Sequence, residues 1–506
     1  MRLLLTNEQM READGYTIDV LGVPSLTLME RAGTALANEA GRLAPTGKIL
    51  CVCGGGNNGG DGFVCARILR ERGREAEAVF FAKRTSGECR YNLEKFCQSG
   101  GVIYEEIPSE EYALIVDCLL GTGFKGALSD EYAQRIEKMN ACKKRGVKIL
   151  SADIPSGVRG DDGSVDGVAV CADETLCIGE QKTGVLLGDG IDYSGVVKTC
   201  DIGIQLPRPT DEYAYVLEKT DVAALLPKRK RNTHKGSYGR AAIVAGSKEY
   251  TGAAYLSTAA CLRAGAGYTT LFTPPEILPY YILKAPEALL RAWTDEALQE
   301  LLAYDAVAYG MGMGVSESVA NGAKYLLAHF TGTLILDADA INALAFYEKE
   351  NLTAVFAAKK CGVVLTPHIK EFSRLTGESV QTLLEKGVFA PFAFAKKHGV
   401  TVLLKNAVSV VTDGKRTAVN TTGNAGQAKG GSGDVLSGVL AALCAQGLSA
   451  FDGACAGAYL TGRAAELASQ KVGEYSLLAT DVIAYLGTSF LLLGIPENAD
   501  KNGGEQ

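Results

Sequence analysis

Residues 424–438, which read NAGQAKGGSGDVLSG, constrain the fold more than any other stretch of the chain. Three glycines and a serine fall within five positions, and an apolar helical pattern follows from Val435 onward. A glycine-rich turn that opens a helix presents backbone N–H groups and the positive end of the helix dipole, which bind anions, most often phosphate. An acid beside that anion is unfavourable unless it takes up a proton during a reaction, so Asp434 is a candidate base. The alternative is that Asp434 only complements the helix dipole.

The composition describes an ordinary globular protein with more than one domain. A chain of 506 residues is too long for one core and predicts two or three domains. The net charge of −7 argues against nonspecific binding to nucleic acid, which needs a basic face. The 14 cysteines form no CxxC pair and the 4 histidines do not cluster, so we expect reduced thiols rather than zinc. With no signal peptide and no run of ~18 apolar residues, we expect a cytoplasmic protein without a membrane partner.

The first half of the chain alternates short apolar strands with helical stretches. This pattern predicts a doubly wound, Rossmann-like α/β sheet of parallel strands. Strands are expected at residues 48–53, 76–81, 113–118, 147–153 and 197–203, and helices within 7–43 and at 63–72, 88–99 and 130–145. Ligands bind such sheets at the carboxyl ends of the strands.

Three polar clusters follow three of these strands, and we expect them to converge on one rim of the sheet. They are GGGNNGGDG at 54–62, GTGFKG at 121–126 and DIPSG at 153–157. Asn58, Asp117 and Ser156 offer hard oxygen ligands, which suit a group IA or IIA cation better than zinc. Asp153 is the best acid–base candidate, and Lys125 is a candidate phosphate partner. Taken singly, Asp117 could cap a turn and 121–126 could be a flexible loop.

Together, GGGNNGGDG, DCLLGTGFKG and ADIPSG resemble the NAD(P)H-hydrate epimerase domain, over roughly residues 1–210. The resemblance implies that Asn58, Asp117 and Ser156 hold a potassium ion. It also implies that Asp153 contacts the substrate and transfers a proton while the R and S epimers interconvert at C6 of the hydrated nicotinamide ring. The residues implied to bind the hydrated nucleotide are Asn57, Asn58, Gly59, Gly60, Asp61, Gly121, Thr122, Gly123, Phe124, Lys125, Gly126 and Ala127.

The join between the two halves is marked by Pro207 and Pro209. The expected domains are 1–212, 213–496 and a polar tail at 497–506. The basic run at 228–231 reads as a solvated linker, with a surface that attracts an anionic ligand as the alternative.

The second half also begins as α/β. Strands are expected at 240–245, 268–272, 306–309, 334–336, 362–365 and 402–404, a hairpin at 409–412 and 417–420, and helices from 251, 432 and 450. Four features follow its strands: the GMGMG run at 310–314, the acids Asp337 and Asp339, His368, and Lys405. The acids could bind a metal or position a loop, although Asp339 could also cap a helix. Lys405 suits a nucleotide phosphate, and His368 could contact ligand or be structural.

These features resemble the ribokinase-like fold, and within it the ADP-dependent NAD(P)H-hydrate dehydratase, over about residues 220–495. The motifs are HKGSYGRAAIVAGS, GAAYLSTAACLRAGAG, LTPH and NAGQAKGGSGDVLSG. The implied substrate contacts are Ala254, Gly312, His368 and Asp434. The implied ADP contacts are Lys405, Asn406, Ala407, Val408, Ser409, Lys429, Gly430, Gly431, Ser432 and Gly433, and Mg²⁺ is expected with the nucleotide.

The resemblance implies a repair reaction on hydrated NADH and NADPH. Asp434 would deprotonate the C6 hydroxyl of the S hydrate, which takes the terminal phosphoryl group of ADP and then leaves, giving NAD(P)H, AMP and phosphate. The epimerase half would return the R hydrate to the S form. Two alternatives stay open: a small-molecule kinase that keeps the phosphorylated alcohol, and a first domain that is only a binding scaffold. We also expect a homo-oligomer.

Overall fold

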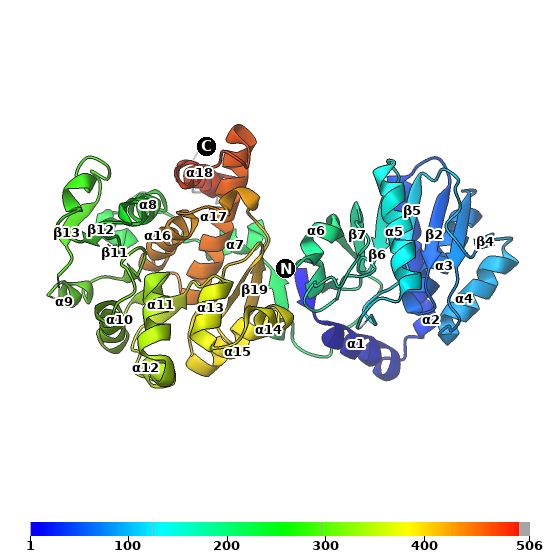
Figure 1. Cartoon of the computed structure of the whole chain (residues 1–506), viewed down its shortest axis with the longest axis horizontal. Helices are drawn as coiled ribbons and strands as arrows, with labels where there is room; N and C mark the ends of the chain where they lie inside the picture. Colours follow the sequence, from blue (N-terminus) through cyan, green and yellow to red (C-terminus); the bar gives the residue numbers. More distant parts are fainter. Residues whose placement is uncertain (1, 125, 295, 495–506) are drawn as a thin grey trace, which may run out of the picture. The chain divides into compact units, whose positions relative to one another are not determined.

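The computed structural model describes residues 2–124, 126–294 and 296–494 (Figure 1). Contacts divide the chain into two compact units, Arg2–Ala214 and a second unit that begins at Tyr215. Each unit contains a largely parallel sheet covered by helices on both faces, which confirms the predicted α/β class. The predicted polar tail at 497–506 lies outside the described residues.

The sheet of the first unit contains seven strands, and all its paired strands run parallel. In spatial order they are β4 (Ile103–Tyr104), β3 (Ala76–Phe80), β2 (Ile49–Cys53), β5 (Leu114–Cys118), β6 (Lys148–Ala152), β7 (Glu174–Ile178) and β9 (Val196–Cys200). One face packs on α2 (Ser25–Leu43), α3 (Asn57–Glu71) and α4 (Gly87–Gln98), and the other on α5 (Asp130–Lys144). All five predicted strands of this half are present.

Helix α3 begins at Asn57, so the prediction of a loop up to Gly62 and a helix from Phe63 was wrong. The glycines of its first turn are required by close packing. A Cβ at Gly59 would lie 1.8 Å from the Gly54 carbonyl oxygen, and one at Gly60 would lie 2.6 Å from the Met29 sulfur. The glycine-rich composition therefore reflects a helix pressed against its neighbours, and not a mobile loop.

Besides β4 and β7, two further short strands of the first unit had no counterpart in the predicted elements. Strand β1 (Arg2–Leu5) pairs in parallel with β8 (Gln181–Lys182), with Leu5 opposite Lys182. Helix α1 (Asn7–Gly15) follows β1 directly, capped by the Thr6 side chain. These strands place Lys182 and α1 beside the carboxyl end of β6, where the first site lies.

The sheet of the second unit has parallel strands followed by an antiparallel hairpin. In spatial order the strands are β13 (Leu289–Ala292), β12 (Tyr268–Thr273), β11 (Arg240–Val244), β14 (Ala306–Tyr309), β15 (Thr333–Leu336), β16 (Gly362–Leu365), β17 (Thr401–Leu404), β18 (Ser409–Thr412), β19 (Thr417–Asn420) and β10 (Ala214–Val216). Every strand predicted for this half is present, including both strands of the hairpin. The short strands β10 and β13 were not predicted.

Two separate apolar cores cover the two faces of this sheet. One contains α8 (Thr251–Arg263), α16 (Ser432–Ala445), α17 (Ala450–Val472) and α18 (Ala479–Leu492). The other contains α10 (Glu317–His329), α11 (Asp339–Tyr347), α12 (Leu352–Ala357), α13 (Ile369–Thr376) and α15 (Phe389–His398). Among the residues described, no helix is both long enough and apolar enough to cross a membrane.

Candidate functional sites

A cleft of about 750 Å³ opens at the carboxyl ends of β2, β5 and β6 in the first unit. Residues of all three polar clusters line this cleft. Two of the clusters lie in contact, because a Cβ at Gly121 would lie 3.2 Å from Asn58 Cβ. The predicted residues that line it are Asn57, Asn58, Asp61, Gly121, Thr122, Gly123, Phe124 and Asp153. Gly59 and Gly60 are buried in the first turn of α3, and Gly126 and Ala127 are exposed. Lys125 lies outside the described residues.

Asn58, Asp117 and Ser156 form a buried oxygen-rich group behind this cleft. The Ser156 hydroxyl donates to Asp117 Oδ1 at 2.6 Å, and the Ser156 N–H donates to Oδ2 at 2.9 Å. Leu120 links them to Asn58: its carbonyl accepts from Asn58 Nδ2 at 2.8 Å, and its N–H donates to Ser156 Oγ at 2.8 Å. Asn58 Oδ1 is buried without a hydrogen-bond partner among the described residues. Amide, carboxylate and hydroxyl oxygens in this arrangement fit a hard cation.

The electrostatics of Asp117 also fit a cation at this position. Burial raises the pKa of Asp117, and hydrogen bonds from Ser156 and Ser151 act against that rise. A bound cation would stabilise the ionised carboxylate and would satisfy the unpartnered Asn58 oxygen.

Asp153 lies directly after β6 in a strained backbone conformation, with φ at +67°. Its Oδ1 accepts from the Ile178 N–H at 3.0 Å and from the ammonium group of Lys182. Lys182 Nζ also donates to the Ile178 carbonyl at 2.6 Å. A non-glycine residue is held at positive φ only where its surroundings fix it, so this carboxylate is firmly positioned in the cleft.

Asp153, Asp14 and Asp61 all interact electrostatically with Lys182, and the pKa values of Asp14 and Asp61 are strongly perturbed. Burial raises the pKa of Asp14 to about 6, Lys182 opposes the rise, and Asp153 adds to it. Burial also raises the pKa of Asp61 well above its usual value, with a further contribution from Asp153. The sequence interpretation missed Lys182 and Asp14, because neither belongs to a glycine-rich motif. The signal available for Lys182 was a lone lysine soon after the apolar run at 175–178.

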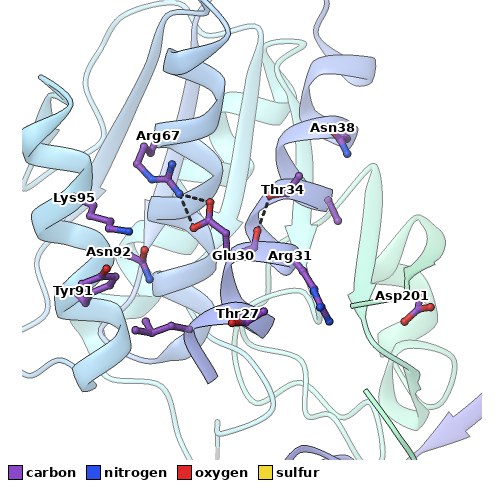
Figure 2. A pocket seen from close by; sticks show the side chains of 12 residues that line it. Thr27, Glu30, Arg31, Thr34, Asn38, Arg67, Tyr91, Asn92, Lys95 and Asp201 are labelled. Atoms are coloured by element: carbon purple, nitrogen blue, oxygen red, sulfur yellow. Dashed lines mark hydrogen bonds and ion pairs between the residues drawn. The ribbon is translucent and has the colours of Figure 1, made fainter. Parts of the chain in front are cut away.

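A second hollow, of about 590 Å³, lies among α2, α3 and α4 (Figure 2). Figure 2 shows Arg67 directed at Glu30, and its Nη2 donates to both carboxylate oxygens at 2.6 Å. Arg31 donates to the Ile202 carbonyl at 2.9 Å. This hollow contains none of the predicted site residues, and its arginines are already paired, so we assign it no part in a reaction.

In the second unit, the glycine turn before α16 meets the ends of two strands. The Lys405 ammonium donates to Asp337 Oδ1 at 2.8 Å, and Ser437 of α16 donates to Oδ2 at 2.8 Å. A Cβ at Gly433 would lie 3.3 Å from Lys405 Nζ and 3.7 Å from Asp337 Oδ2. The structure therefore brings Gly433, Lys405 and Asp337 together, and Gly431, at φ +97°, leads into the helix.

Asp434, in the first turn of α16, has the electrostatics of a proton acceptor. Burial raises the pKa of Asp434 to about 7, Asp337 adds to the rise, Lys405 opposes it and Asp339 adds again. Burial acts to lower the pKa of Lys405, but Asp337 and Glu371 outweigh it, so that pKa is raised and the group stays cationic. A carboxyl that titrates near neutrality can accept a proton and release it again.

The glycine run at 310–314 packs closely against α8 and α11. Gly312 has φ +65°, and a Cβ there would lie 2.8 Å from Tyr250 Cβ. Asp339 Oδ2 accepts from the Gly314 N–H at 2.8 Å, so Asp339 positions this loop. The helix cap is Ala338, and Asp339 is the first residue of α11. No cluster of three potential metal-ligating acids, histidines or cysteines occurs in the described part of the chain.

His368 has a structural role that is visible in the structure. Its Nδ1 accepts from the N–H groups of Lys370 and Glu371 at 3.1 and 3.3 Å and so caps α13. Burial lowers the pKa of His368, with Glu371 opposing and Lys405 adding to the effect. The residue is exposed and bridges in parallel to Lys405. A substrate contact at this position stays a prediction.

The remaining predicted contacts differ in how accessible they are. Lys429 Nζ donates to the carbonyls of Tyr475 and Leu477 at 2.6 and 2.9 Å, so it ties the turn to the segment before α18. Ala254 is fully buried in α8, and Val408 is buried with 5% of its surface exposed. Partly exposed or exposed positions are Asn406, Ala407, Ser409, Gly430, Gly431, Ser432 and Gly433.

Comparison with known proteins gives a consistent result over both units. A family profile described as NAD(P)H-hydrate dehydratase matches residues 241–487, and one described as YjeF-related protein N-terminus matches 25–184. The bifunctional NAD(P)H-hydrate repair enzyme of Thermofilum pendens is 35% identical over 94% of both chains. That of Escherichia coli is 32% identical over 98% of this chain and 95% of its own. The ADP/ATP-dependent NAD(P)H-hydrate dehydratase of Bacillus subtilis, co-crystallised with ATP and Mg²⁺, is 29% identical, with 55% of this chain and 98% of that chain covered and a TM-score of 0.49.

Proposed function

Because the chain belongs to the family of bifunctional NAD(P)H-hydrate repair enzymes, we propose that the cleft of the first unit is its epimerase site and that the turn before α16 is its dehydratase site. The observation that carries the second assignment is Asp434, a carboxyl with a pKa of about 7 in the helix turn that follows the glycines. An anion-binding turn and a proton acceptor in one place suit the transfer of a phosphoryl group to a hydroxyl.

In the dehydratase site, Asp434 takes the proton of the C6 hydroxyl of the S hydrate. The backbone N–H groups from Gly430 to Gly433 bind the terminal phosphate of the nucleotide, and Lys405 supplies a positive charge beside them. The hydroxyl oxygen accepts the phosphoryl group, and the ring nitrogen lone pair then expels it as phosphate. Reduced nicotinamide and AMP are the other products when ADP is the donor.

The choice of ADP rests on the resemblance of LTPH and NAGQAKGGSGDVLSG to the ADP-dependent dehydratases. Mg²⁺ is proposed to arrive on the nucleotide phosphates, where it usually keeps several waters. Asp337 is already bound by Lys405 and Ser437, and Asp339 by the Gly314 N–H, so these acids do not form a separate magnesium cage.

In the epimerase site, Asp153 is the proton-transfer residue, and the first turn of α3 at 57–61 and the segment at 121–127 bind the hydrated nucleotide. A potassium ion is proposed on Asn58 Oδ1, Asp117 and Ser156. The unpartnered buried Asn58 oxygen supports this site, because burial of an unsatisfied amide oxygen costs free energy that a cation would offset. When bound, the ion would fix the loop after β5 and add positive potential to the cleft.

The test of the dehydratase assignment is to incubate chemically hydrated NADH, of known R and S content, with enzyme and ADP. We expect the absorbance of reduced nicotinamide to return and AMP and phosphate to form in equal amounts. A small-molecule kinase would instead leave a stable phosphorylated alcohol and restore no NADH, which would refute the assignment. Replacing ADP by ATP in parallel reactions measures the donor preference.

The test of the epimerase assignment uses the R hydrate alone. Full conversion of the R hydrate to NADH requires epimerisation before dehydration. We expect the Asp153→Ala variant to convert pure S hydrate at the normal rate and R hydrate only at its spontaneous rate of epimerisation. Unchanged turnover of the R hydrate by that variant would refute the role of Asp153. A cytoplasmic location and a homo-oligomer stay predictions from the sequence, and light scattering measures the second.

A further inference from the structure

Lys182 is the least accessible charged group in contact with the proposed proton-transfer residue. Its surface is 1% exposed, and its ammonium group contacts Asp153 Oδ1 and the Ile178 carbonyl. A buried lysine needs a counter-charge, since desolvation strongly disfavours an unpaired ammonium ion. Asp153 provides it, and the pKa of Lys182 is raised above its usual value although burial alone would lower it. Lys182 is therefore a buried cation that is paired directly with the Asp153 carboxyl group.

The two oxygens of Asp153 are held differently. Oδ1 accepts from both Lys182 and the Ile178 N–H, whereas no hydrogen bond ends on Oδ2 among the described residues. Asp153 lines the cleft. The pinned oxygen fixes the carboxylate in one orientation and leaves the other oxygen to accept a proton from a ligand.

A second carboxyl reaches the same cleft from a different part of the chain. Asp14 belongs to α1, lines the cleft together with Asp153 and Lys182, and interacts electrostatically with both. No hydrogen bond to its carboxylate occurs among the described residues. Asp61 also lines the cleft, and burial raises its pKa well above the usual value of a carboxyl.

We propose that Lys182 and Asp14 complete the proton-transfer apparatus of the epimerase, with Lys182 as a positioning residue that holds the Asp153 carboxyl group in one orientation and Asp14 as the second proton-transfer group. The proposal rests on the assignment of this cleft as the epimerase site. Inversion at C6 needs one group that protonates the departing hydroxyl and another that deprotonates the incoming water. Two carboxyls that line one cleft, one paired with a buried lysine and one with a pKa raised to about 6, meet that requirement.

Epimerisation of the R hydrate begins with loss of the C6 hydroxyl and ends with addition of water to the other face of the ring. The Asp14 carboxyl gives its proton to the C6 hydroxyl, the C6–O bond breaks, water leaves, and the ring nitrogen lone pair forms a C6=N bond. Water then adds to the other face, a new C6–O bond forms, the electron pair returns to nitrogen, and Asp153 takes the proton released by that water. Asp14 ends ionised and Asp153 protonated, which is the state that the reverse reaction requires. One proton moves from Asp153 back to Asp14 before the next forward turnover.

Other titratable and charged groups face this set and must stay constant in a test. They are Arg11 on α1, Asp61 on α3, Arg84 and Glu88 beside the cleft, Cys177 on β7, Glu180, Tyr132 and Cys200. Each is kept in the Lys182 and Asp14 variants and in their two controls, and Asp61 alone is changed in a separate comparison.

The experiment measures epimerisation of the isolated R and S hydrates by full-length enzyme without ADP, as a function of pH. The variants are Lys182→Gln, Lys182→Arg and Asp14→Asn, with Lys144→Gln and Asp192→Asn as matched exposed controls. Turnover of S hydrate with ADP shows in each case whether the second unit is intact. Circular dichroism and hydrogen exchange show whether the first unit is folded.

For Lys182→Gln we expect a loss of at least roughly tenfold in kcat and an alkaline limb of the pH profile that moves to higher pH, because the variant loses the cation that lowers the pKa of Asp14. Lys182→Arg should restore the position of that limb. For Asp14→Asn we expect a loss of roughly 10²-fold and the disappearance of the alkaline limb for the R hydrate, which in the parent enzyme lies near the Asp14 pKa of about 6.

Three results would overturn the inference while leaving the function in place. The first is a folded Lys182→Gln enzyme whose alkaline limb has not moved. The second is a folded Asp14→Asn enzyme with an unchanged pH profile. The third is loss of the alkaline limb in Asp61→Asn but not in Asp14→Asn. If the parent enzyme does not epimerise either hydrate, the assignment of the cleft itself fails, which is a separate outcome.

Discussion

Lys405 donates a hydrogen bond of 2.8 Å to Oδ1 of Asp337, a carboxylate with only 1% of its surface exposed. Ser437 holds the other oxygen of Asp337 at 2.8 Å, so the pair is fixed by α16 itself. This buried pair lies beside the turn at Gly433. Its two charges act in opposite directions on the pKa of Asp434, which Asp337 raises and Lys405 lowers. The pH dependence of the dehydratase should therefore respond to both residues.

The most direct consequence concerns Asp434 itself. Asp434→Asn removes the proton acceptor but keeps the shape of the side chain and the start of α16. We expect dehydratase kcat to fall by about 10²- to 10⁴-fold with little change in KM. The measurement is the return of reduced nicotinamide absorbance from pure S hydrate with ADP. Epimerisation of the R hydrate should stay normal in the same protein, and a loss of both activities would indicate misfolding.

The pH profile gives a second prediction. A carboxyl base must be ionised, and burial and Asp337 raise the pKa of Asp434 to about 7, so the dehydratase rate should fall as pH drops below about 7. Lys405→Met removes a cation that lowers this pKa, so its acidic limb should move to higher pH. Asp337→Asn removes an anion that raises it, so that limb should move to lower pH. Shifts in one common direction for both variants would contradict this electrostatic account.

Much of this second site followed from the sequence because of one geometric rule. The carboxyl ends of parallel strands lie at one edge of a sheet, so residues after successive strands must meet there. That rule alone predicts that Asp337, Lys405 and the GMGMG run lie at one edge of the sheet. It could not show that His368 caps α13 through Nδ1 or that Lys429 bonds to the Tyr475 carbonyl. Those bonds depend on where side chains and distant loops lie.

The strand-end rule does not predict all residues of the first site. Lys182 reaches Asp153 because the two-residue strand β8 pairs with β1, and so short a strand has no readable periodicity. Asp14 follows charged residues of α1, and in the sequence it looks like part of a solvated helix face. The start of α3 at Asn57 was hidden because glycine normally disfavours helix interiors, whereas here Gly59 and Gly60 are needed for close packing.

The cation site gives a third prediction, for Ser156→Ala. The change removes the 2.6 Å hydrogen bond to the buried Asp117 and one proposed potassium ligand. We expect a loss of roughly 1 to 3 kcal/mol in the stability of the first unit and a weaker response of epimerisation to potassium. Rates in potassium, sodium and lithium chloride at equal ionic strength measure the second effect. Ser99→Ala, which removes a surface hydroxyl bonded to the Phe96 carbonyl, is the matched control.

Asp14 gives a fourth prediction, on stability. Its pKa in the folded chain is about 6, above the ordinary value of 3.8, so the folded state binds more protons between these values. Stability contributed by the neutral carboxyl is complete below about pH 4 and is lost as pH rises through 6. Asp14→Asn should therefore be more stable than the parent above pH 7, by on the order of 1 to 3 kcal/mol, and equal to it near pH 4.

This difference must be read from the first unit alone. The single tryptophan, Trp293, belongs to the second unit, so its fluorescence does not report on α1. Hydrogen exchange of the α1 amides at pH 5 and pH 7.5, corrected for intrinsic exchange rates, supplies the measurement. Greater protection in the parent enzyme than in Asp14→Asn at the higher pH would contradict the expected sign.

Gly312→Ala gives the last prediction, because the position combines a backbone restriction with a steric one. Gly312 has φ +65°, and a Cβ there would lie 2.8 Å from Tyr250 Cβ and 3.0 Å from Ala253 Cβ, next to the start of α8. Gly314 has φ +80° but nothing within 4 Å of its Cβ position, so Gly314→Ala carries the backbone strain without the clash. We expect about 1 kcal/mol of destabilisation in Gly314→Ala and a larger loss in Gly312→Ala.

The effect on activity separates the two changes further. The clash must push the 310–314 loop away from α8 or shift Tyr250, and either movement alters the proposed substrate contact at Gly312. Gly312→Ala should therefore raise the KM for the S hydrate roughly tenfold or more, while Gly314→Ala leaves it near the parent value. Equal KM values in the two variants would show that the close approach at Gly312 serves packing alone and that the substrate binds elsewhere on the strand ends.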